Sequence, residues 1–262
     1  MTHIAATAVV DRDAQLADDV VVGDYAVIGP RVSIGAGSSV GAHAVLTGYT
    51  TIGRGNQIHA HAVLGGPPQD KKYAGEDTRL VLGDYNMIRE FCTFNTGTVQ
   101  DQGVTRIGSH NWIMAYVHIA HDCIVGDNTV LANNATLAGH VHVGNWVILG
   151  GMTGVHQFVH VGAHAMTGGG TILLLDLPPF VICNGNPAQA HGLNVEGLKR
   201  RGFSAESITA LRRAYKTLYR EGLTVAAAAE AIRAQAEAAS EQRALVLELL
   251  DFVQSSQRGI VR

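Results

Sequence analysis

The sequence predicts a parallel β-helix built from six-residue repeats, followed by a smaller α-helical domain. Three observations support this prediction: aliphatic residues recur at every sixth position, glycine is frequent while charge is scarce, and the composition changes near residue 196. The chain has 262 residues, of which 31 are glycine and 16% are charged, whereas globular domains usually carry about 25% charged residues. Many turns around a wide apolar interior are therefore expected.

The six-residue period identifies the first domain. Neither a helix, with a period of 3.6, nor a half-buried strand, with a period of 2, explains it. Three hexads can instead close one triangular turn of 18 residues, with the aliphatic side chains inside and successive turns stacked in parallel about 4.8 Å apart. Glycine often follows the aliphatic residue, and we expect it to relax each turn. The first uninterrupted run consists of Ile4, Val10, Leu16, Val22, Ile28, Ile34, Val40, Leu46, Ile52, Ile58 and Leu64.

The period breaks twice, near residues 65–81 and 100–106, and otherwise continues to Val161. Both breaks predict loops expelled from the prism. The first carries Asp70 and Lys72 among other polar residues. Polar loops on a rigid scaffold are frequent carriers of function.

The domain boundary follows from composition. Residues 1–196 hold all 13 histidines and a formal charge of −7, whereas residues 197–262 hold no histidine and a charge of +4. In the second segment Ser204, Thr224 and Ser240 are candidate N-caps for three helices. We expect residues 1–196 to form the β-helix and residues 197–262 to form a helical domain that covers its last coil.

Composition also excludes several classes of protein. At 47% hydrophobic residues the chain is not disordered. No apolar run reaches the about 18 residues of a membrane span, and the N-terminal segment lacks the features of a signal peptide, so a cytoplasmic location is expected. The acidic first domain argues against nucleic-acid binding. Three unpaired cysteines form no metal motif.

The 18-residue turn brings histidines together. His121, Gly139 and Gln157 should share one column, with Asp122, His140 and Phe158 in the next, and His118 and His156 close by. Such a cluster supports three chemistries. His121 could act as a general base oriented by Asp122, with the Gly139 N–H holding an oxyanion. Alternatively, His118 and His121 could bind zinc. The third possibility is a nucleophilic Cys123. This residue occupies an inward position of the hexad, which is typical of a core side chain.

Five motifs in order resemble one family. The strings are QDKKYAGE (69–76), HIAHDC (118–123), LANNATLAGHV (131–141), GGMTGVHQF (150–158) and NVEGLKRRGFS (194–204). Together they are similar to the UDP-N-acetylglucosamine O-acyltransferases of lipid A biosynthesis. The resemblance covers essentially the whole chain and implies a left-handed β-helix.

The resemblance implies transfer of an (R)-3-hydroxyacyl group from acyl carrier protein to the 3-hydroxyl of UDP-N-acetylglucosamine. It implies neither a metal nor an organic cofactor, because the phosphopantetheine of the carrier is part of the donor. His121 would be the base, Asp122 its partner and Gly139 the oxyanion donor. Gly169 would be the acyl-chain ruler, the residue that sets which acyl-chain length is accepted. The substrate-binding residues implied are Asp70 and Lys72 from another subunit, His118, His140, His156 and Gln157, and, for nucleotide or phosphate, Asn194, Glu196, Arg200 and Arg201.

The sequence departs from the family pattern at Asn95, where a histidine is expected.

A homotrimer is expected, because a triangular prism has three flat faces and the histidine face needs a neighbour's loop. Other hexapeptide-repeat acyltransferases, a zinc-dependent carbonic-anhydrase-like enzyme and a purely structural β-helix remain alternatives. A bound metal would indicate the second of these.

Overall fold

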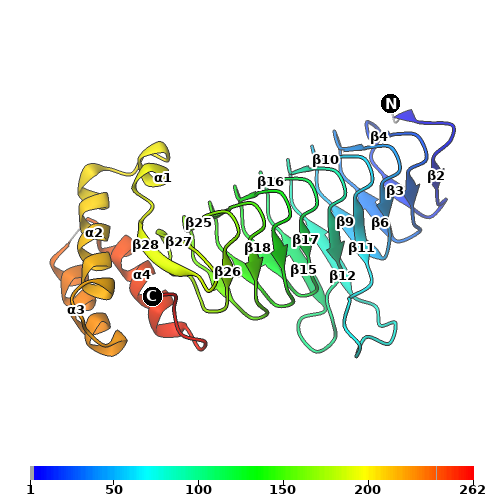
Figure 1. Cartoon of the computed structure of the whole chain (residues 1–262). Coiled ribbons are helices and arrows are strands. Elements are labelled where there is room, and N and C mark those ends of the chain that lie inside the picture. The colour runs from blue at the N-terminus through cyan, green and yellow to red at the C-terminus, as the bar shows by residue number, and fades with distance from the viewer. Residues whose placement is uncertain (1–2, 240) are drawn as a thin grey trace.

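A computed structural model describes residues 3–239 and 241–262, which form a three-sided prism with helices at one end (Figure 1). In the described residues three sheets make the faces, each coil contributes one parallel strand to each sheet, and an antiparallel pair ends the first sheet. The chain starts at one end of the prism and finishes beside the helices at the other. In the part of the chain that the structure describes, no helix is long and apolar enough to cross a membrane.

The strands are short and follow one another around the prism. The first sheet contains β1 (His3–Ile4), β4 (Val21–Val22), β7 (Ser39–Val40), β10 (Gln57–Ile58), β13 (Met87–Ile88), β16 (Trp112–Ile113), β19 (Val130–Leu131), β22 (Ile148–Leu149), β25 (Met166–Thr167), β27 (Val181–Asn184) and β28 (Gln189–Leu193). The second contains β2 (Val9–Val10), β5 (Val27–Ile28), β8 (Val45–Leu46), β11 (Val63–Gly66), β14 (Thr93–Asn95), β17 (His118–Ile119), β20 (Thr136–Leu137), β23 (Gly154–Val155) and β26 (Ile172–Leu173). The third contains β3 (Gln15–Leu16), β6 (Val32–Ile34), β9 (Tyr49–Ile52), β12 (Arg79–Leu82), β15 (Val104–Ile107), β18 (Ile124–Val125), β21 (His142–Val143) and β24 (His160–Val161).

The strand register shows where chain is expelled from the coils. Partners in neighbouring coils are 18 residues apart, as in the pair His142 and His160. Gln57 instead pairs with Met87, and Met87 with Trp112, because loops leave the prism in these two coils. The loops occupy residues 67–78 and 96–103, since β11 continues to Gly66 and β15 already begins at Val104.

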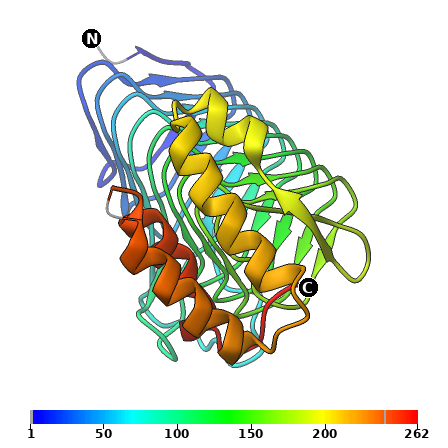
Figure 2. The ribbon, with the colours of Figure 1, turned by 90° about the vertical axis from the view of Figure 1, so that its left-hand side faces the viewer.

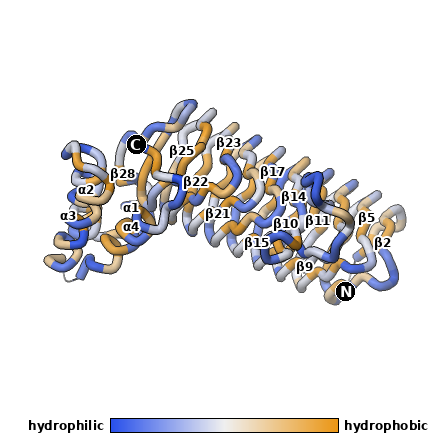
Figure 3. The backbone as a smooth tube through the Cα atoms, turned by 90° about the horizontal axis from the view of Figure 1, so that it is seen from below, coloured by the Kyte–Doolittle hydropathy of each residue, from blue (hydrophilic) through white to orange (hydrophobic). Residues whose placement is uncertain are grey.

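The aliphatic positions of the hexads build one continuous core along the prism. Ile28, Leu64 and Leu131 are at most 1% exposed. Ile4 is 44% exposed because it belongs to β1, the edge strand of the first sheet. In Figure 3 the hydrophobic colour accordingly recurs in coil after coil.

The glycines that follow the aliphatic residues have a different role from the one that the sequence suggested. Gly41 and Gly53 do not have the left-handed backbone conformation of a relaxed turn. A Cβ at Gly41 would lie 2.7 Å from the Ala60 nitrogen, and one at Gly53 would collide with Asp84 in the next coil. Side-chain-bearing residues take the positive φ instead, for example His43 at 58° and Asp122 at 59°. Glycine is therefore required by the close approach of coils.

Four helices close the far end of the prism (Figure 2). They are α1 (Val195–Arg200), α2 (Ala205–Tyr219), α3 (Val225–Ala238) and α4 (Arg243–Ser255). The side chains of Ser204 and Thr224 cap α2 and α3, as the sequence predicts. Ser240, the third expected cap, lies outside the described residues. Tyr215 of α2 packs into the core of the prism, so the helices cover its open end.

His164 lies at the junction between the prism and the helices. Its ring stacks on Phe180 and meets the edge of Phe203, and its Nδ1 lies 3.3 Å from a guanidinium nitrogen of Arg201. Burial, followed by the charge of Arg201, lowers the pKa of His164 from 6.5 to about 4. The folded protein therefore holds this imidazole neutral at pH 7.

We expect the junction to lose stability in mild acid. As the pH falls from 6.5 toward 4, the unfolded chain binds a proton at His164 that the folded chain does not, so the free energy of unfolding decreases. A His164→Phe variant keeps the aromatic contacts without the titration. Its melting temperature, followed by circular dichroism, should fall by a few degrees less than that of the parent over this range. Equal pH slopes would contradict the prediction, and His43→Phe on the exposed corner is the control.

Candidate active site

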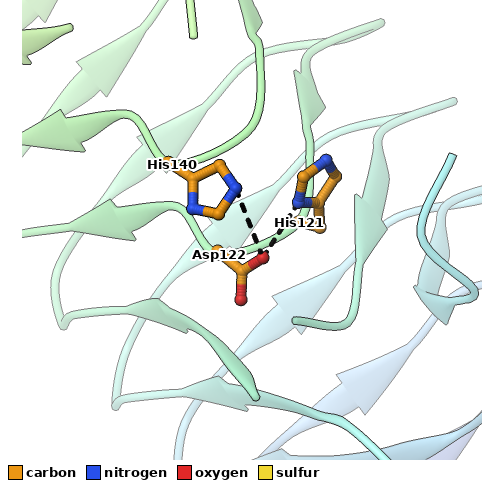
Figure 4. Close-up of side chains that lie close together, drawn as sticks. All are labelled: His121, Asp122 and His140. Atoms are coloured by element: carbon orange, nitrogen blue, oxygen red, sulfur yellow. Dashed lines mark hydrogen bonds and ion pairs between the residues drawn. The ribbon is translucent and has the colours of Figure 1, made fainter. Parts of the chain in front are cut away.

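The centre of the site is a row of three side chains at one corner of the prism, in which the carboxylate of Asp122 lies between the imidazoles of His121 and His140. Asp122 and His140 occupy equivalent corner positions in successive coils, with φ of 59° and 62°. The Nδ1 of His121 lies 2.9 Å from Oδ2 of Asp122, and the Nε2 of His140 lies 3.9 Å from the same oxygen (Figure 4). The Asp122 side chain is 1% exposed and that of His121 is 14% exposed.

Thr98 holds the Asp122 carboxylate in place, and Thr105 holds the Asp122 backbone. The backbone N–H of Thr98 donates to Oδ1 at 2.8 Å, and the Thr98 hydroxyl donates to Oδ2 at 2.6 Å. The backbone N–H of Asp122 donates to the Thr105 hydroxyl. Sequence reasoning missed both threonines, because Thr98 reaches Asp122 only through the conformation of the 96–103 loop.

The pairing leaves one nitrogen of His121 free for chemistry. Since a carboxylate only accepts, Nδ1 of His121 donates to Asp122, and Nε2 then carries the lone pair. Gly139 lies against this nitrogen: a Cβ there would come within 2.7 Å of Nε2. Among the described residues, the N–H of Gly139 donates to no acceptor. Nε2 of His121 therefore lies next to a residue whose backbone N–H is unused within the described part of the chain.

His118 and Cys123 flank this centre. The Thr93 hydroxyl lies 2.8 Å from Nδ1 of His118, and burial lowers the pKa of His118, which keeps the ring neutral at pH 7. Cys123 is fully buried, its thiol lies 3.1 Å from the carbonyl oxygen of Ala138, and burial raises its pKa to about 12. A thiol in this state is a core side chain and a poor nucleophile.

His156 and Gln157 are exposed two coils beyond His121 and one coil beyond Gly139. The Nδ1 of His156 lies 3.0 Å from the carbonyl oxygen of Gln157 and 3.3 Å from a guanidinium nitrogen of Arg258. Arg258 comes from the segment after α4, so the end of the chain returns to the prism beside the histidines. Sequence reasoning did not connect Arg258 with this face, because no repeat relates the two segments.

Asp70 and Lys72 lie in the loop 67–78, which projects from the prism. The loop is organised locally: Oδ1 of Asp70 accepts from the backbone N–H of Lys72 at 3.0 Å. Asn95, which replaces the expected histidine, anchors its start by donating to the carbonyl oxygen of Pro67 at 2.9 Å. Among the described residues, no contact joins Asp70 or Lys72 to the histidine cluster of the same chain.

The residues expected to bind nucleotide or phosphate lie at both ends of α1, with Asn194 and Glu196 at its start and Arg200 and Arg201 at its end. Asn194 is 2% exposed and caps this helix, since its Oδ1 accepts from the N–H of Gly197. Exposed Glu196 pairs with Lys199 at 3.0 Å. Arg200 is exposed, whereas the Arg201 guanidinium lies 5.4 Å above the Trp146 ring and burial lowers its pKa. One copy of the chain thus keeps these residues apart from the loop 67–78.

Gly169 has room for a side chain. Its backbone is not left-handed, and a Cβ would meet only the carbonyl oxygen of Gly151, at 3.5 Å. The left-handed corner conformation belongs to its neighbour Gly170, with φ of 69°. The corner itself therefore does not require glycine at position 169.

The hydrogen bonds favour an imidazole–carboxylate pair over a zinc site. Within residues 3–239 and 241–262, one group of three candidate ligands lies within 4.8 Å, namely His121, Asp122 and His140. It does not include His118, whose Nδ1 contacts Thr93. Both oxygens of Asp122 already accept hydrogen bonds from Thr98.

Comparisons with known proteins cover both domains. A family model described as UDP-N-acetylglucosamine O-acyltransferase, domain 2, matches residues 176–261. A model of the bacterial transferase hexapeptide, six repeats, matches residues 13–48 and 105–139. The structure of LpxA from Acinetobacter baumannii is 46% identical, with a TM-score of 0.94 over 99% of each chain. That of the Francisella novicida UDP-N-acetylglucosamine acyltransferase is 38% identical, with a TM-score of 0.94 over 100% of this chain and 94% of the other.

These matches confirm the left-handed parallel β-helix with C-terminal helices that the sequence predicts. The acyl-(acyl-carrier-protein)–UDP-N-acetylglucosamine O-acyltransferase of Thiobacillus denitrificans is 64% identical over 264 residues, which cover 100% of both proteins. That of Herminiimonas arsenicoxydans is 56% identical over 262 residues, again over the full length of both. The chain belongs to the acyl-(acyl-carrier-protein)–UDP-N-acetylglucosamine O-acyltransferase family.

Proposed function

We propose that the chain transfers an (R)-3-hydroxyacyl group from acyl carrier protein to the 3-hydroxyl of UDP-N-acetylglucosamine, with His121 as the general base. As a member of its family it is an O-acyltransferase of lipid A biosynthesis. The observation that carries the proposed chemistry is the 2.9 Å distance between Nδ1 of His121 and Oδ2 of Asp122, which in a neutral ring puts the lone pair on Nε2, next to Gly139.

The proposed reaction follows from these three groups. Nε2 of His121 takes the proton of the sugar 3-hydroxyl as its oxygen attacks the donor's thioester carbonyl. Asp122 stabilises the imidazolium, and the N–H of Gly139 donates to the oxygen of the tetrahedral intermediate. The C–S bond then breaks, and the imidazolium returns the proton to the departing thiolate. No step requires a metal or an organic cofactor.

The remaining site residues are assigned to substrate binding. His118, His140, His156 and Gln157 lie around the base and would line the sugar and acyl positions. Asn194, Glu196, Arg200 and Arg201 would hold nucleotide or phosphate. For Asn194 we expect an indirect contribution, because its side chain already caps α1 and donates to the carbonyl oxygen of His164.

A homotrimer would complete the site. Among the described residues Asp70 and Lys72 make no contact with the histidine cluster of their own chain, so a neighbour's loop would supply them. In this arrangement residues 1–196 carry the proposed catalytic residues. Residues 197–262 cover the end of the prism and contribute Arg200 and Arg201 to the proposed nucleotide site.

The test of the proposed function is direct. The purified protein is incubated with UDP-N-acetylglucosamine and a series of 3-hydroxyacyl carrier proteins, and the sugar nucleotide is analysed by mass spectrometry. We expect one added 3-hydroxyacyl group on the 3-oxygen. Metal analysis of the same sample separates the zinc-enzyme alternative. Absence of an acylated product with every donor would refute the function.

Sharing of the site between copies predicts complementation. Lys72→Ala and His121→Ala variants should each be poorly active, but a mixture that exchanges subunits should recover up to about a quarter of the parent activity, because each mixed trimer contains one intact interface. Turnover is measured after co-refolding. A co-refolded mixture that forms mixed trimers, verified by native mass spectrometry, but regains no activity would show that each site is built within one chain.

Gly169→Met should shift donor preference toward shorter acyl chains. A Cβ fits at this position, and a methionine side chain in an acyl groove would exclude the terminal methylenes, each of which contributes about 0.8 kcal/mol when buried. Competition between donors of different length measures the shift, while the KM for the sugar nucleotide should stay unchanged. An unaltered donor profile in a folded variant would place the ruler elsewhere.

A further inference from the structure

The 96–103 loop touches the active site twice, and the second contact belongs to Asp101. Oδ2 of Asp101 lies 2.8 Å from Nδ1 of His140, and the two side chains are 36% and 16% exposed. Thr98, three residues earlier, fixes the Asp122 carboxylate. The same loop therefore holds both Asp122 and the ring next to it.

The lone pairs of Asp122 explain why His140 must be held. Oδ2 of Asp122 accepts from the Thr98 hydroxyl at 2.6 Å and from Nδ1 of His121 at 2.9 Å. A carboxylate oxygen has about two lone-pair sites, so these donors fill it. The Nε2 of His140 lies only 3.9 Å away. If it carried a proton and approached, it would displace His121 from Asp122.

Asp101 prevents this competition. Because a carboxylate only accepts, Nδ1 of His140 donates to Asp101, and with the ring in this tautomer Nε2 has no hydrogen to donate to Asp122. The His140 ring is also placed by stacking on Phe158, with centroids 4.4 Å apart, and by an edge contact with His121 at 5.1 Å. Stacking is compatible with a flip of the ring about its Cβ–Cγ bond, which keeps the ring plane but exchanges the sides on which the nitrogens lie, so the hydrogen bond to Asp101 decides where the nitrogens lie.

We propose that Asp101 is a positioning residue that keeps His140 from competing with His121 for Asp122. This inference rests on the proposed role of the His121–Asp122 pair. Asp101→Ala should lower kcat about tenfold, in line with loss of a hydrogen bond that involves a charged group. Asp101→Asn keeps an oxygen acceptor for Nδ1–H and should remain within about twofold of the parent. Gln102→Ala, at the exposed neighbouring position, is the matched control.

Two measurements separate this role from a general effect on the loop. In a His140→Phe background, Asp101→Ala should cause no further loss of kcat, because the competing ring is gone. A crystal structure of Asp101→Ala should show a ring nitrogen of His140 within hydrogen-bond distance of Asp122. A ring that stays near its present position, an additional loss in the His140→Phe background, or equal losses for Asp101→Ala and Asp101→Asn would overturn the proposal. The crystallographic result does not depend on turnover, so it distinguishes failure of this inference from failure of the proposed function.

Discussion

Replacing His121 by alanine should lower kcat by about 10²- to 10⁴-fold, the usual contribution of a positioned general base. The ring lies at a partly open corner and is 14% exposed, so its loss should leave the coil intact. Steady-state kinetics with both substrates measure kcat, and the melting temperature reports the fold. We expect the melting temperature to change by no more than a few degrees.

A matched histidine makes this result specific. His110 also occupies a corner of the prism, where it stacks on Tyr85, but it lies outside the cluster. His110→Ala should keep the parent kcat. A folded His121→Ala variant within tenfold of the parent would rule out His121 as the base, and an equal loss in both variants would indicate a structural cause.

The repeat made most of the fold predictable. A period of six is compatible with neither helix nor single strand, and a triangular coil of 18 residues places His121 beside Gly139 and Asp122 beside His140 without any structure. The structure brings these residues together as that arithmetic requires. The helix caps Ser204 and Thr224 were predictable because capping depends on local sequence alone.

The contacts of the expelled loops could not be predicted in this way. Thr98 and Asp101 lie where the period is broken, so no column assigns them a neighbour, and their contacts depend on how the loop folds back. Arg258 reaches His156 from the other end of the chain for a similar reason. A loop contributed by another copy leaves no trace in the periodicity of one chain.

The glycines after the aliphatic residues occur where the repeat predicts a turn, but the predicted reason for them, relaxation of that turn, is wrong. The sequence predicts that glycine after the aliphatic position relaxes a corner, but at Gly41 and Gly53 a side chain is excluded because the next coil lies too close. The same criterion applied to Gly139 gives a different neighbour. There the excluded space is filled by the imidazole of His121 and not by backbone. A methyl group at this position would therefore act on the base itself.

Gly139→Ala should consequently lower kcat by about 10²-fold, because displacement of a catalytic group by about 1 Å lowers the rate by about this factor. The added Cβ would lie 2.5 Å from Cε1 of His121, so the ring must move and lose its alignment with Asp122. Gly192→Ala, where a Cβ would meet no atom within 4 Å, is the control in the same assay. Alanine keeps the backbone N–H, so the oxyanion donor is retained and the loss reports the ring. In a His121→Ala background the space next to position 139 is free, so adding Gly139→Ala should lower kcat little further. A further loss of about 10²-fold in kcat would show that position 139 acts independently of His121.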